Sequence, residues 1–140
     1  MDRTTDTALG RPGAKPDGTP HRVLVGIGSA HLLKQVSDHL ATAGFQTTAT
    51  TADGRETVIT YKKLDGTVDL VILDAALPGQ DGCTTLAALR AHDPDVRAIL
   101  VSDTDDQETA FKATALGAKD YLTTPLTPHD FITRLADALN

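Results

Sequence analysis

Residues 68–82, VDLVILDAALPGQDG, decide the fold of this 140-residue chain. The stretch begins with a near-continuous apolar run that ends at Leu73, a pattern typical of a central parallel strand covered on both faces. Asp74 follows the run, and a loop rich in turn residues continues to Gly82. The sequence therefore predicts a buried strand that ends at an aspartate, with a loop and a helix after it.

The same unit of strand and helix recurs along the rest of the chain. Apolar patterns predict five strands that alternate with five helices, and the last helix has a full start signal: Thr127 as cap, Pro128 at the first helical position and Asp130 three residues after the cap. Such alternation predicts a parallel sheet with helices on both faces and its chemistry at the carboxyl ends of the strands. The predicted strands are 22–25, 45–50, 68–73, 97–101 and 121–122. The first two predicted helices are about 30–43 and 56–64; the third follows the loop that ends at Gly82 and carries Leu86, Leu89 and Ala91, the fourth carries Ala110 to Leu116 and ends at Gly117, and the fifth begins at Pro128 and carries Phe131 to Leu139.

Residues 1–20 differ in composition from the rest of the chain. They are rich in Thr, Gly, Pro and Asp and have almost no large apolar side chains, so they offer little burial to offset the entropy of ordering. We therefore expect a disordered tail over 1–20 and one domain over 21–140.

Composition excludes several classes of function. A net charge of -6 and a pI near 5.1 argue against direct nucleic-acid binding, which relies on clustered Lys and Arg. No apolar run approaches the roughly 20 residues that cross a membrane. Cys83 is the only cysteine, which excludes an internal disulfide and fits a reducing compartment. We expect a cytoplasmic protein that does not bind membranes.

Two segments carry a family resemblance. Residues 74–82, DAALPGQDG, resemble the phosphoacceptor loop of bacterial response-regulator receiver (CheY-like) domains, and residues 117–125, GAKDYLTTP, resemble the fifth-strand signature of that family. The resemblance covers about residues 21–140, and the two motifs together are highly specific for this family. Membership of the family implies a flavodoxin-like three-layer fold of five parallel strands in the order 2-1-3-4-5.

The resemblance also implies roles for individual residues. Asp74 would be the phosphoacceptor, Ser102 would donate a hydrogen bond to a phosphoryl oxygen, and Tyr121 would be the aromatic residue that turns inward on activation. The peptide bond before Pro125 would be cis.

The sequence departs from the family pattern at three pocket positions. Two adjacent acids that hold Mg²⁺ would align with Ile27 and Gly28, and a lysine would align with Thr124. Mg²⁺ requires oxygen ligands anchored by carboxylates, and phosphoryl transfer depends on charges that neutralise the equatorial oxygens. We therefore expect no catalytic residue and no metal site; if a metal ion did bind, Asp74 would be the candidate ligand. We also expect no resident cofactor, and Mg²⁺ is the alternative.

Our leading hypothesis is a degenerate receiver, not an enzyme, that acts in two-component-type signal transduction through protein contacts and without aspartyl phosphorylation. The partner surface would be the face of the fourth helix, fifth strand and fifth helix. It would include Gln107, Phe111, Lys119, Tyr121 and Phe131, although both Phe residues fit a core equally well. A histidine kinase or an output domain would be the partner, and the chain itself would be a monomer or weak homodimer.

Two alternatives remain open. An acid from the loop 103–106 would replace the missing pair and allow conventional phosphorylation of Asp74, although acids before a helix are also explained by the helix dipole. Alternatively, the loss of charged groups leaves a less polar pocket above the sheet that would admit an uncharged small molecule.

Overall fold

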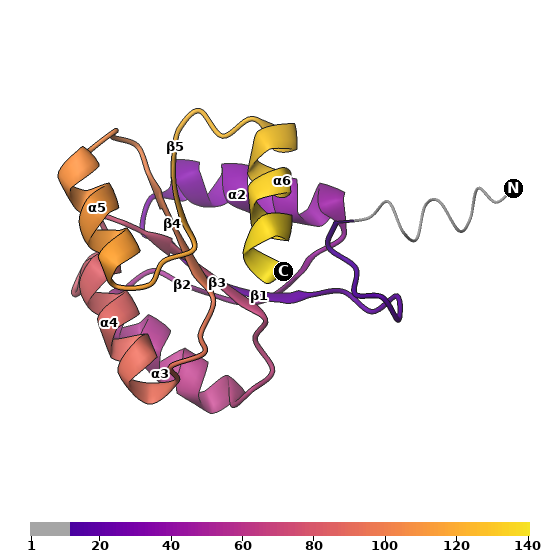
Figure 1. Cartoon of the computed structure of the whole chain (residues 1–140), viewed down its shortest axis with the longest axis horizontal. Helices are drawn as coiled ribbons and strands as arrows, with labels where there is room; N and C mark the ends of the chain where they lie inside the picture. The colour runs from indigo at the N-terminus through magenta and orange to yellow at the C-terminus, as the bar shows by residue number, and fades with distance from the viewer. Residues whose placement is uncertain (1–11) are drawn as a thin grey trace, which may run out of the picture.

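The computed structural model describes residues 12–140, which form a single twisted parallel sheet flanked by helices (Figure 1). The strand order is β2-β1-β3-β4-β5, as predicted. No helix in residues 12–140 is both long and apolar enough to cross a membrane. The strands are β1 Arg22–Gly26, β2 Gln46–Thr51, β3 Leu70–Asp74, β4 Ala98–Ser102 and β5 Asp120–Thr123; the helices are α2 Ala30–Ala43, α3 Gly54–Leu64, α4 Gly82–His92, α5 Gln107–Ala115 and α6 Pro128–Leu139.

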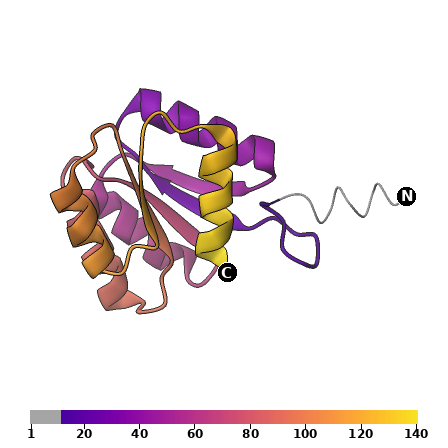
Figure 2. The same ribbon diagram turned by 45° about the horizontal axis from the view of Figure 1, so that its top comes forward.

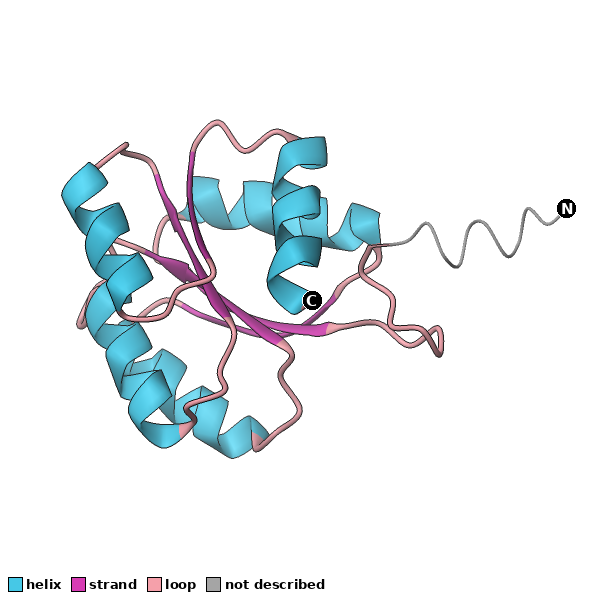
Figure 3. Cartoon of the chain, viewed as in Figure 1, coloured by secondary structure: helices cyan, strands magenta, loops and turns pink. Residues whose placement is uncertain are grey.

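Helices cover both faces of the sheet (Figures 2 and 3). One apolar cluster joins α2 and α6 to the first face, and a second joins α3, α4 and α5 to the other. Successive residues of β1 alternate between the two clusters: Val23 and Val25 belong to the first and Leu24 to the second. This alternation follows from the pleat of a strand, and it explains why the interior positions of the central strands are apolar on both faces.

Three helices begin at an aspartate whose side chain caps them. The carboxylates of Asp53, Asp81 and Asp106 accept hydrogen bonds from the first free N–H groups of α3, α4 and α5. Because Asp53 caps α3, this helix begins at Gly54 and not at position 56 as predicted. α6 begins at Pro128 with Thr127 as its N-cap residue, as predicted, although Thr127 makes no side-chain capping bond.

Residues 12–20 form a hydrogen-bonded turn against the domain. The Gly13 N–H donates to Ala43 O at 3.1 Å, the His21 N–H donates to Gly13 O at 2.6 Å, and the Lys15 ammonium lies 3.3 Å from the Asp69 carboxylate. This part of the predicted tail is therefore ordered, because backbone pairing and an ion pair replace the missing apolar burial. Residues 1–11 of the predicted tail lie outside the described residues.

Candidate functional site

Asp74 lies at the carboxyl end of the central strand, between β1 and β4. Its residue exposure is 6%, and both carboxylate oxygens accept backbone hydrogen bonds, from Ala76 N–H at 2.9 Å and from Gly28 N–H at a long 3.4 Å. Within residues 12–140, no Lys or Arg nitrogen lies within 4.0 Å of this carboxylate. Its hydrogen-bond partners in this part of the chain are thus backbone amides, not a cation.

Ile27 lies in the core and not at the surface of a pocket. It is 2% exposed and belongs to the apolar cluster that includes Leu32, Leu126 and Phe131. An acid at this position would place a carboxyl group among aliphatic and aromatic side chains, where the charged form is costly. The residue therefore contributes packing to the core.

The backbone at Gly28 is covered by the loop that follows β3. A Cβ atom added at Gly28 would lie 2.6 Å from Cδ of Pro78, closer than side-chain carbons approach in folded proteins. Any side chain at position 28 would therefore displace this loop.

The donors around Asp74 do not fit Mg²⁺. Within the described residues, no group of three or more His, Cys, Asp or Glu side chains is placed to hold a metal ion. A magnesium ion is usually anchored by one or two carboxylates within an octahedron of oxygens. Neither Ile27 nor Gly28 offers a side-chain oxygen, so each has only its backbone carbonyl to give.

The loop between β4 and α5 contacts the hydroxyl groups of Ser102, at the end of β4, and Thr124, directly after β5. Ser102, which is 6% exposed, accepts a hydrogen bond on Oγ from the Thr104 N–H at 3.1 Å, and its Oγ lies 3.2 Å from Thr104 Oγ1. The Thr124 hydroxyl donates to Asp103 Oδ1 at 3.2 Å, and the Thr124 N–H donates to Ser102 O at 2.9 Å. The sequence analysis did not single out Thr104, because a threonine in an acidic loop carries no motif.

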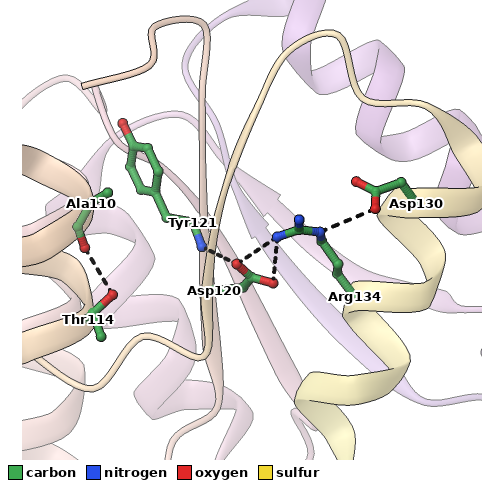
Figure 4. A network of polar contacts seen from close by, with 6 residues as sticks. All are labelled: Ala110, Thr114, Asp120, Tyr121, Asp130 and Arg134. Carbon is green, nitrogen blue, oxygen red and sulfur yellow. Dashed lines mark hydrogen bonds and ion pairs between the residues drawn. The ribbon is translucent and has the colours of Figure 1, made fainter. Parts of the chain in front are cut away.

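Tyr121 lies on β5, between α5 and α6 (Figure 4). Its ring is half-buried, and its hydroxyl donates a long hydrogen bond of 3.4 Å to Thr104 O. The neighbouring Asp120 accepts two 3.1 Å hydrogen bonds from Arg134 of α6, and Arg134 also bonds Asp130 at 3.3 Å. The Asp120 carboxylate raises the pKa of Arg134. These charges tie α6 to β5 beside Tyr121.

The two phenylalanines of the predicted partner surface differ in burial. Phe131 is 1% exposed and lies in the core, whereas Phe111 is 78% exposed on α5. Gln107 and Lys119 are exposed as well. The face of α5, β5 and α6 therefore presents one large apolar side chain, Phe111, among polar neighbours.

The acids before α5 are engaged in local structure. Asp103 accepts the Thr124 hydroxyl, and Asp106 caps α5 by accepting the N–H groups of Glu108 and Thr109 at 3.1 and 3.3 Å. Hydrogen bonds from the side chain and backbone of Thr109 lower the pKa of Asp106. This geometry is that of a helix cap.

Two cavities in the described part of the chain lie away from Asp74. One, of about 300 Å³, is lined by Lys15, Arg22, Asp69 and neighbouring residues at the amino ends of the strands. The other, of about 510 Å³, lies along α6 and is lined by residues that include Ile132 and Ala136. Neither is the pocket above the sheet that the sequence suggested.

A sheet of this order with an aspartate buried at the end of its third strand defines the class of CheY-like α/β domains. The chain belongs to the response regulator receiver domain family, whose sequence pattern it matches over residues 29–136. The Thr124–Pro125 peptide bond is cis, the isomer that the resemblance implies.

Individual relatives agree with this assignment. The chain is 35% identical to the chemotaxis protein CheY of Treponema pallidum over 127 residues, which covers 91% of this chain and 88% of that protein. It is 29% identical to the CheY of Thermotoga maritima, with 85% and 94% covered. The CheY in a crystal structure of the CheX-CheY-BeF3-Mg²⁺ complex from Borrelia burgdorferi superposes with a TM-score of 0.87 at 30% identity, covering 93% and 98% of the two chains.

Proposed function

We propose that this chain is a degenerate receiver of a two-component-type pathway that signals by binding a protein partner and whose state is not set by phosphorylation of Asp74. The burial of Ile27 carries the proposal, because a core side chain at 2% exposure occupies the place of a metal-binding acid. Without an anchored Mg²⁺ and without the lysine at position 124, the developing charge of a phosphoryl group would have little to neutralise it.

The proposed partner surface is the face formed by α5, β5 and α6. Phe111 gives it an exposed aromatic anchor, and exposed aromatic residues commonly carry much of the binding energy of an interface. A histidine kinase or an output domain is the proposed partner class, and a CheX-like protein is a further candidate because the Borrelia burgdorferi CheY was solved in a complex with CheX. The proposal includes a cytoplasmic location, no enzymatic activity, no nucleic-acid binding and at most weak homodimerisation.

Conventional phosphorylation is the second candidate function. It is favoured by the Borrelia burgdorferi relative, which was crystallised with beryllofluoride and Mg²⁺, and by the presence of Asp74 itself. In this candidate an acid near Asp103 would supply the metal ligand after rearranging away from Thr124.

Treatment with acetyl phosphate and Mg²⁺, followed by intact-mass spectrometry, separates the two candidates. The proposal expects no phosphoryl mass increment on the wild-type chain. An increment that appears in the wild type and is absent in Asp74→Asn would overturn it.

Partner binding provides a second test. Binding of a purified CheX-like protein or histidine kinase should be the same for the wild type and Asp74→Asn, and Phe111→Asp should weaken it by about tenfold or more, as expected for loss of an aromatic anchor. Equal binding by Phe111→Asp would remove this face from the proposal. A binding gain that requires phosphorylated Asp74 would overturn the phosphorylation-independent mode.

A further inference from the structure

Polar side chains connect the β4–α5 loop to the ends of β4 and β5. Asp103 Oδ1 accepts the Thr124 hydroxyl at 3.2 Å, and Thr104 Oγ1 lies 3.2 Å from the buried Ser102 Oγ. We call Asp103, Thr104 and Thr124 the loop latch. The Asp103–Thr124 contact joins residues that are 21 positions apart in sequence, so it fixes how the loop lies against the end of β5.

The loop latch occupies two hydroxyl groups that phosphoryl chemistry would otherwise use. By resemblance, Ser102 would bond a phosphoryl oxygen and Thr124 replaces a lysine. In the structure the Ser102 hydroxyl faces Thr104, and the Thr124 hydroxyl faces Asp103. Within residues 12–140, neither hydroxyl is hydrogen-bonded to Asp74. The acceptor of the Thr124 hydroxyl is a carboxylate, which makes that hydrogen bond stronger than one between neutral groups.

The loop also contacts Tyr121 and leads into α5. Tyr121 donates its 3.4 Å hydrogen bond to the backbone carbonyl of Thr104, in the middle of the loop. Among the residues of α5, only Ala113 is buried. A helix with so little buried surface is held weakly by packing, so its position depends on the loop that leads into it.

We propose that the loop latch replaces the phosphoryl group as the device that sets this receiver's conformation. The hydrogen bonds of Thr124 with Asp103 and of Thr104 with Ser102 hold the β4–α5 loop, Tyr121 and α5 in one arrangement, which presents Phe111 without any modification of Asp74. The inference rests on the proposed function, because it describes how a receiver that is not phosphorylated keeps one output state.

The chain contains a reporter and an internal reference for this idea. Its two tyrosines are Tyr121, at the loop, and Tyr61, which is 7% exposed in α3 and donates a 2.6 Å hydrogen bond to Asp93. Fluorotyrosine labelling therefore gives two ¹⁹F resonances, one from each environment. Full-length protein is compared as wild type, Thr104→Val, and the double variant Asp103→Ala with Thr124→Val.

A matched control is available on α5 itself. Thr114→Val removes a hydroxyl that donates to Ala110 O within the helix at 3.0 Å and does not touch the loop. Thr114 and Ala110 are drawn in Figure 4. The control should leave both tyrosine resonances unchanged, which separates an effect of the loop latch from a general effect of losing a threonine hydroxyl.

The inference expects one narrow Tyr121 resonance in the wild type. The double variant should show a second Tyr121 resonance or about a twofold larger linewidth from exchange on the microsecond to millisecond timescale, with Tyr61 unchanged. Thr104→Val should show a smaller change of the same kind. Identical Tyr121 signals in the wild type and the double variant would overturn the inference.

Adding beryllofluoride and Mg²⁺ distinguishes the two possible failures. A saturable change of wild-type Tyr121 would refute the phosphorylation-independent function, whatever the variants do. No change in the wild type, combined with an unchanged Tyr121 in the double variant, would leave that function standing and refute the loop latch alone. An altered Tyr61 signal in the double variant would show general unfolding. In that case Thr104→Val, which leaves the Asp103–Thr124 bond intact, tests the inference: a changed Tyr121 signal with an unchanged Tyr61 signal would support the loop latch, and an unchanged Tyr121 signal would overturn it.

Discussion

Replacing Ile27 with alanine should destabilise the protein by about 3–4 kcal/mol. The change removes three carbon atoms from a side chain that is 2% exposed. At about 0.8 kcal/mol for each buried methylene, the lost transfer free energy is about 2.4 kcal/mol. The cavity left in the cluster of Leu32, Leu126 and Phe131 adds to that loss, which brings the total to the range typical of large-to-small core substitutions. Ile27→Asp should cost more, because it also buries a carboxyl group.

Urea denaturation followed by circular dichroism measures this loss. With an m-value of about 2 kcal/mol per molar, the midpoint for Ile27→Ala should fall by about 1.5–2 M. Ile59→Ala is the matched control, because Ile59 is 54% exposed and its truncation should change stability by less than about 0.5 kcal/mol. A loss below about 1 kcal/mol for Ile27→Ala would show that position 27 is not core, and would remove the main support for the proposed function.

Three further predictions concern the charged and glycine positions. Burial lowers the pKa of His21 below its usual 6.5, so unfolding takes up a proton and the free energy of unfolding should fall as the pH drops through 6.5. Urea titrations at several pH values should therefore show a flatter pH dependence for His21→Asn than for the wild type. Parallel curves for the two proteins would contradict this prediction. Arg134 is 43% exposed, so solvent should screen its ion pair with Asp120. A double-mutant cycle should therefore give a coupling energy of about 0.5–1 kcal/mol for the two side chains, and a value above about 2 kcal/mol would mean that solvent does not screen this ion pair. Gly28→Ala should lower the free energy of unfolding by about 1–3 kcal/mol, because the added methyl group clashes with Pro78. Combining it with Pro78→Ala should recover part of this stability. An equal loss of stability with and without Pro78 would contradict the proposed clash.

The sequence predicted the fold well because its patterns arise from local rules. A fully apolar strand before Asp74 and helical spacing elsewhere predicted the parallel sheet and both layers of helices, and the family resemblance supplied the strand order that the structure has. The structure differs from the prediction where a single tertiary contact sets a helix boundary or orders a segment. Asp53 starts α3 earlier than periodicity indicates, and residues 12–20 pair with Ala43 and Asp69, partners that no local pattern reveals.

The candidate site was predictable in its positions but not in its interactions. The motifs and the strand pattern located Asp74 and Ser102 at the carboxyl ends of β3 and β4, and Tyr121 within β5. They could not show that Ser102 faces Thr104, because a short polar side chain has several nearby partners and tertiary packing chooses among them. They also left Phe111 and Phe131 equivalent, since each fits a helical pattern, and only the packing of α5 and α6 separates an exposed side chain from a core one.

The most direct test of the central claim is a two-dimensional amide NMR titration with Mg²⁺ and then with Mg²⁺ plus beryllofluoride, which mimics a phosphoryl group on Asp74. The proposed function predicts no saturable shift at Asp74, Ser102 or Tyr121 at millimolar concentrations, in the wild type as in Asp74→Asn. Saturable shifts at those residues in the wild type that Asp74→Asn abolishes would contradict it, and would mean that this receiver still recruits a metal ion to its aspartate.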